Sequence, residues 1–190
     1  TTLWTEFKPI SELPQYINPS SGYLFNTNHS PFLATDTRNN LDRKKFDITD
    51  GYETYHNNRS QRVTELINSD KVDYTTFKKI KFDQQLPKEL KYTYGIDSML
   101  SLSANEHPAL KDVITNLQNW DRKAIITSKG AAVFILVYDF VSKRLRGTAS
   151  RQLTKAESIE TYQQVHDYMM QHFGKTDLVL GDIQKLVRGD

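Results

Sequence analysis

A group of amide and imidazole side chains follows a short apolar segment early in the chain. Residues 18–31 read NPSSGYLFNTNHSP, so that Asn26, Asn28 and His29 come directly after the apolar residues 23–25. Carboxamides carry N–H donors that do not titrate, and fixed donors of this kind can stabilise a negative oxygen that develops during a reaction. Side chains at the end of a rigid element are both held and exposed, as a catalytic site requires.

The residue types alone leave other roles open. Asn28 also suits a purely structural position, because Asn side chains often bond to nearby backbone groups in turns such as the one before Pro31. His29 invites a reading as a general base. The remaining histidines, His56, His107, His166 and His172, lack the company that a metal site needs.

A turn and a strand should position these side chains. Asn18, Pro19 and Gly22 mark a tight reversal, because Pro fixes φ and Gly accepts positive φ. Residues 22–28 then predict a short strand. Residues 33–57 are rich in Asp, Asn, Thr and Arg and predict a surface loop.

Helices are expected after the loop. Apolar residues recur there at spacings of three and four, which gathers them on one helical face. The clearest case is residues 155–173, with Gly174 as the C-cap. Further helices should begin at Asn57 or Asn58, at Asp73 and at Pro108. Residues 131–138, AAVFILVY, fit either a buried strand or a buried helix.

The motif in residues 18–31 resembles a specific enzyme family. It is similar to the penicillin acylase (penicillin amidase) family of N-terminal nucleophile hydrolases, which includes acyl-homoserine lactone acylases. Three further motifs follow in the same order as in that family: NRSQRVTEL at 58–66, LQNWD at 117–121 and LGDIQKLVRGD at 180–190. The last is similar to the acyl-homoserine lactone acylase branch.

The resemblance assigns roles to individual residues. Asn28 matches the Asn whose side-chain N–H enters the oxyanion hole, and Arg62 matches the Arg beside the catalytic centre. His29 would not be the base, because the nucleophile's own α-amine transfers the proton in this family. Trp120 and Asp121 match a structural helix end.

The family nucleophile is a Ser exposed by self-cleavage at the start of the large subunit, well ahead of the Asn word. The resemblance therefore implies that residues 1–190 are an internal fragment of the large (beta) subunit, inactive when isolated. Within it we expect an extended chain and strand at 1–32, a loop at 33–57 and a mostly helical lobe at 58–190. Thr1 is a possible nucleophile in principle, but the prolines that follow indicate a linker.

The expected fold class is thus mostly α with a short β segment at the N-terminal end, a piece of the αββα sandwich of the whole enzyme. The family has a helix after its Trp-Asp word, so residues 131–140 are expected to be helical.

The same resemblance implies a substrate class and partners. The substrate would be a small acyl amide, either a penicillin-like amide or an acyl-homoserine lactone, in antibiotic metabolism or a related process. The partners would be the remainder of the large subunit and the small subunit, in a periplasmic or secreted enzyme. No cofactor is expected. Some relatives hold a structural calcium through an Asp after the Asn word, but Asp36 has a different spacing, so no metal is assigned.

The composition of the chain argues against several classes of partner and site. A net charge of +2 and the absence of cysteine argue against a polyanion partner, a disulfide scaffold and a thiolate metal site. The longest apolar run is too short to span a bilayer, so neither nucleic acid nor membrane is expected as a partner. Two alternatives remain: a non-catalytic helical interaction domain, and a polyanion-binding module using the lysines of residues 78–91.

Overall fold

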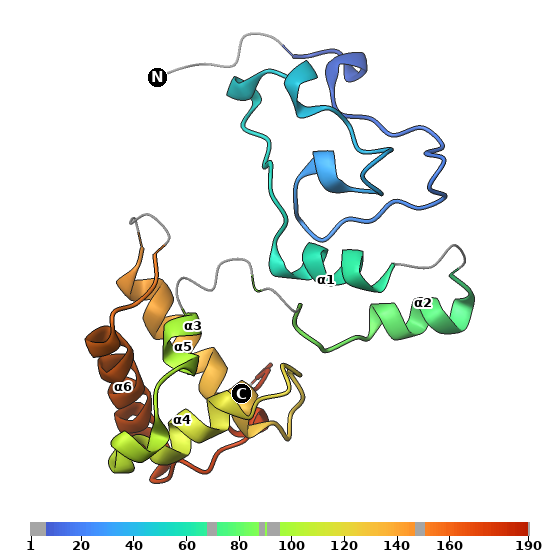
Figure 1. Cartoon of the computed structure of the whole chain (residues 1–190). Helices are drawn as coiled ribbons and strands as arrows, with labels where there is room; N and C mark the ends of the chain where they lie inside the picture. The colour runs from blue at the N-terminus through green and yellow to red at the C-terminus, as the bar shows by residue number, and fades with distance from the viewer. Residues whose placement is uncertain (1–6, 68–71, 88–89, 91–95, 147–150, 190) are drawn as a thin grey trace. The chain divides into compact units, whose positions relative to one another are not determined.

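The computed structural model describes residues 7–67, 72–87, 90, 96–146 and 151–189. The chain divides into two compact units, Thr1–Ser69 and Asp70–Asp190, coloured blue to teal and green to red in Figure 1. Thr1, Lys88 and Lys91 lie outside the described residues.

The regular structure is helical, as the sequence predicts. Within the described ranges no sheet is formed, and one isolated bridge joins Gln85 to Lys123. No helix in these ranges has both the length and the apolar character needed to cross a bilayer.

Over residues 7–67, the first unit combines short 3-10 turns with one α-helix. These elements are η1 (Ile10–Glu12), η2 (Pro31–Leu33), η3 (Arg43–Lys45), η4 (Ile48–Asp50) and α1 (Asn58–Leu66). Asp42 caps η3 and Asp47 caps η4, each accepting a hydrogen bond from a backbone N–H two residues ahead. Short acidic side chains favour such local bonds over long helices, so the polar loop at 33–57 is a chain of capped turns.

The structure does not confirm the strand expected at residues 22–28. The backbone at Phe25 donates one hydrogen bond to the Ala34 carbonyl at 3.0 Å, but no ladder follows. A strand needs a partner with a continuous register, and the described residues supply none for this segment.

An aromatic cluster holds the loop of the first unit together. The buried Phe32 ring lies 5.2 Å from the ring of Phe46 and 5.8 Å from that of Tyr52. The guanidinium of Arg43 lies over Phe32, 5.4 Å from the ring centre. Because Phe32 follows the Asn word directly, this packing anchors the C-terminal side of the candidate site.

The second unit contains the larger hydrophobic core. Its α-helices are α2 (Tyr74–Lys81), α3 (Ile96–Leu100), α4 (Lys111–Gln118), α5 (Lys129–Arg144), α6 (Lys155–Phe173) and α7 (Leu180–Ile183), with 3-10 turns η5 (Ala104–Glu106) and η6 (Pro108–Leu110). Helix α5 packs against α4, α6 and α7 (Figure 1). The fully buried side chains include Val133 and Val137 of α5, Ile114 of α4 and Tyr162 of α6.

Helix α5 resolves the ambiguous apolar run in favour of a helix. Ser128 caps it by accepting from the Ala131 N–H at 3.1 Å. Neighbouring helices cover most of its surface, so eight of its residues are buried. A helix buried on several sides shows no amphipathic period, which is why the sequence alone does not distinguish it from a strand.

The Trp120-Asp121 motif follows the end of α4, and Trp120 packs against the start of α5. The Trp120 ring stacks on Phe134 with ring centres 4.4 Å apart, and its Nε1–H donates to the Lys123 carbonyl at 2.9 Å. A Cβ at Gly130 would lie 2.3 Å from the Cβ of Trp120. Gly130 therefore permits the close approach of the two segments, and the structural role expected for Trp120 is confirmed.

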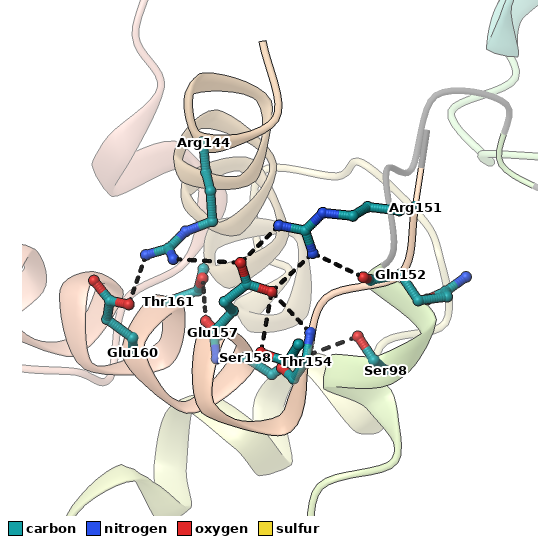
Figure 2. A network of polar contacts seen from close by, with 9 residues as sticks. All are labelled: Ser98, Arg144, Arg151, Gln152, Thr154, Glu157, Ser158, Glu160 and Thr161. Carbon is teal, nitrogen blue, oxygen red and sulfur yellow. Dashed lines mark hydrogen bonds and ion pairs between the residues drawn. The ribbon is translucent and has the colours of Figure 1, made fainter. Parts of the chain in front are cut away.

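Helix α6 begins in a network of charged side chains, which Figure 2 shows. Thr154 and Glu157 form a capping box. Gly174 ends the helix with φ +70°, as predicted. Arg151 donates to both carboxylate oxygens of Glu157, at 2.7 and 2.8 Å. Arg151, together with the Thr154 N–H, holds the pKa of Glu157 far below its ordinary range.

Candidate functional site

Asn28 lies exposed at the head of a tight turn in the first unit. Its φ is +56°, a left-handed conformation that Asn tolerates better than most residues. The Asn28 N–H donates to the side-chain oxygen of Asn26 at 2.8 Å. Asn26 thus makes the local turn bond, and Ser30 caps η2 by accepting from the Phe32 N–H at 3.2 Å. The turn-capping role that residue types also allowed for Asn28 is carried by these two neighbours.

Asn57 fastens this turn to the start of α1. Its Nδ2 donates to the carbonyl oxygens of Thr27 and Asn28, both at 2.9 Å. Its Oδ1 accepts from the Ser60 N–H at 2.9 Å and so caps the helix, as the sequence predicts. The Asn57 carboxamide therefore joins the turn at residues 27–28 to the first turn of α1.

Arg59, in the first turn of α1, reaches the side chain of Asn28. Its Nη2 donates to Asn28 Oδ1 at 3.3 Å. A guanidinium carries donors only, so it binds the oxygen end of the amide. The Nδ2 end of Asn28 is consequently directed away from Arg59.

Arg62, the second residue assigned by the motif, lies one turn further along α1. Its Nη1 pairs with Glu65 Oε2 at 3.0 Å, and its side chain is 22% exposed. The structure thus brings Asn28 against the helix that carries Arg62, and Arg59 of the same helix donates to the Asn28 carboxamide.

His29 contacts the backbone on both sides of the turn through its ring nitrogens. The Thr27 N–H donates to its Nδ1 at 3.2 Å, and its Nε2 lies 2.9 Å from the Leu33 carbonyl. Its ring stacks on Phe25 at 4.8 Å and on His56 at 5.9 Å. Both ring nitrogens of His29 thus have backbone partners, which suits a supporting role.

Asp36 makes local hydrogen bonds within the turn at residues 36–39. Asn39 donates to Asp36 Oδ1 from its backbone N–H at 2.9 Å and from its side chain at 2.6 Å. These bonds, with Arg38, lower the pKa of Asp36. The described part of the chain holds no cluster of three or more His, Asp or Glu side chains placed to bind a metal ion.

Sequence reasoning missed two contacts of this site. Asn57 is recognisable as a helix cap, but its bonds to residues 27 and 28 join positions 30 and 29 residues apart, so they leave no local sequence pattern. Arg59 precedes Arg62 by three residues, so both belong to one side of α1. That spacing is the signal that could have drawn attention to Arg59.

Comparison with known proteins agrees with the motif. A sequence model described as penicillin amidase matches residues 1–184. The match includes Asn28, Arg62 and the Trp-Asp word. No curated protein matches the chain significantly.

Proposed function

Because the chain belongs to the penicillin amidase family of hydrolases, we propose that it forms part of an enzyme that cleaves acyl amides, and that Asn28 stabilises the reaction's oxyanion. Penicillin-like amides and acyl-homoserine lactones are the substrate classes that fit the motifs. Arg62 is the proposed organiser of the same centre.

The observation that supports this proposal is the carboxamide of Asn28, which is exposed although its backbone is tightly held. Bonds from Asn26 and Asn57 fix the backbone, and the side chain remains at the surface. Amide hydrolysis passes through a tetrahedral oxyanion, and a fixed N–H donor binds that oxygen better than it binds the substrate carbonyl. An anchored, neutral amide on an open face suits this task.

Arg62 would contribute a permanent positive charge. A guanidinium does not lose its proton near neutral pH, so Arg62 can hold nearby polar groups in place through every step of the reaction. Its partial burial and its bond to Glu65 restrict the side chain, which favours an organising role over direct contact with substrate.

The acyl-accepting nucleophile is proposed to come from outside residues 1–190. By family analogy it is an N-terminal Ser of the large subunit, whose α-amine acts as the base. The partners of this chain would then be the rest of the large subunit and the small subunit, in a periplasmic or secreted enzyme with an αββα sandwich. The isolated chain would be inactive.

The test is Asn28→Ala in the complete enzyme. Loss of one oxyanion donor typically lowers kcat by about 10²–10³, and KM should change little because the substrate carbonyl binds that donor weakly. Asn105→Ala, which removes another exposed carboxamide, is the matched control. Wild-type kcat in Asn28→Ala would refute the assignment.

A further inference from the structure

An oxyanion hole built on a carboxamide has an orientation problem. The two ends of the Asn side chain are nearly equal in shape, and its final torsion is broad. Rotation by half a turn replaces the N–H donors with a carbonyl oxygen, which would repel the developing negative charge. Donation therefore requires a contact that distinguishes the oxygen of Asn28 from its nitrogen.

Arg59 makes that distinction. Its Nη2 lies 3.3 Å from Asn28 Oδ1, and because arginine has no acceptor, the reversed amide would place its own donors against a cation. Asn57 holds only the backbone carbonyl of Asn28, so it leaves the torsion of the side chain free.

The position of Arg59 is itself fixed by the fold. Asn57 ties residues 27 and 28 to the first turn of α1, and Arg59 belongs to that turn. The Asn57 side chain thus holds the backbone of Asn28 close to the backbone of Arg59, which lies two residues after Asn57. This keeps the Arg59 side chain within reach of the Asn28 carboxamide.

We infer that Arg59 is a positioning residue that orients the carboxamide of Asn28 with its N–H donors toward the reacting oxygen. The inference rests on the proposed oxyanion role of Asn28. Arg59 acts through Asn28 and need not touch the substrate.

Removing this contact should cost less than removing Asn28. With Arg59 present, a charge-assisted hydrogen bond biases the two orientations about tenfold toward the donating one. Without Arg59 the two orientations are about equally populated, so in the complete enzyme we expect Arg59→Ala to lower kcat about twofold and to leave KM nearly unchanged. Arg59→Lys, which keeps a donor without an acceptor, should retain most of the activity.

A double-mutant cycle isolates the mechanism. In the Asn28→Ala background there is no amide to orient, so Arg59→Ala should have no further effect on kcat. Arg38→Ala, which removes an exposed arginine that pairs with Asp36 in the same unit, is the control and should leave kcat unchanged. Arg59→Met keeps the apolar stem and serves if Arg59→Ala proves unstable in thermal unfolding.

The outcomes separate this inference from the proposed function. Full activity of Asn28→Ala would refute the proposed function itself. A large loss in Asn28→Ala together with wild-type kcat in both Arg59→Ala and Arg59→Met would overturn only the positioning role. An equal loss from Arg59→Ala with and without Asn28 would also overturn it, since Arg59 would then act independently.

Discussion

Three asparagines divide the work of the candidate site at the scale of single residues. Asn26 shapes the turn, Asn57 fastens the turn to α1, and Asn28 accepts a hydrogen bond from Arg59 through its side-chain oxygen. The motif predicts the functional role of Asn28 because the order of its neighbours is distinctive. It does not reveal Arg59, whose contact depends on how residues 28 and 57 meet in space.

Asn57 offers a test that separates capping from fastening. Asn57→Asp keeps the oxygen that accepts from Ser60 N–H but loses both donors to residues 27 and 28. We expect it to preserve α1 while lowering kcat of the complete enzyme, because the turn is released. Asn57→Ala should also lower the free energy of unfolding by about 1 kcal/mol through loss of the cap, as measured by denaturant titration. Equal kcat for Asn57→Asp and wild type would contradict the fastening role.

At the scale of elements, local signals predicted best where the chain caps its own helices. Asp73 and Asn57 begin helices and Gly174 ends one as expected, because a cap depends on residues only a few positions apart. Helix α5 needed family resemblance, since burial on several sides removes its period. The strand expected at residues 22–28 failed for a different reason: pairing requires a partner that local sequence does not report.

Gly130 gives a prediction about the contact between α4 and α5. Alanine is favoured over glycine in helices by about 1 kcal/mol, so Gly130→Ala would ordinarily stabilise α5. Here the added Cβ would lie 2.3 Å from Trp120 Cβ and 2.7 Å from the Asn116 carbonyl. Overpacking of this kind costs about 1–3 kcal/mol, so we expect a net loss of stability in thermal unfolding.

The exposed Asp139 lies on the same helix and supplies the control for that substitution. Asp139→Ala should change the free energy of unfolding by less than about 0.5 kcal/mol, as surface substitutions usually do. An increase in melting temperature for Gly130→Ala would show that the two segments separate at little cost.

The start of α6 should respond to pH. Arg151 and the Thr154 N–H lower the pKa of Glu157 in the folded chain. The stabilisation that results is complete above the ordinary glutamate pKa of about 4.3, and it is lost as pH falls through the lower folded value.

We therefore expect Glu157→Gln to destabilise the chain near pH 7, with a difference from wild type that shrinks as the pH drops below about 4. Thermal unfolding across this pH range measures it. A difference that stays constant with pH would mean that the carboxylate charge contributes nothing.

At the scale of the whole molecule, the family match extends over residues 1–184 and so includes residues of both units. The resemblance predicted this membership and the predominance of helix. Composition alone indicated only an ordinary globular chain, because net charge and apolar content report solubility and burial, not chemistry.

The isolated chain should not turn over substrate. Asn28 and Arg62 are proposed to stabilise the oxyanion and to organise the centre, and the acyl-accepting Ser is proposed to belong to another segment of the enzyme. We expect the purified chain, incubated with a chromogenic acyl amide, to release product no faster than buffer. Turnover that disappears in Thr1→Ala would instead make this chain a complete catalyst with its own N-terminal nucleophile.

The central claim concerns where the amide of Asn28 points, and a crystal structure of the complete enzyme with a tetrahedral adduct on its nucleophile tests it most directly. The account predicts the adduct's negative oxygen at about 2.7–3.1 Å from Asn28 Nδ2, with Arg59 still bound to Asn28 Oδ1. An adduct oxygen held by other donors, with Asn28 turned away from it, would contradict the account.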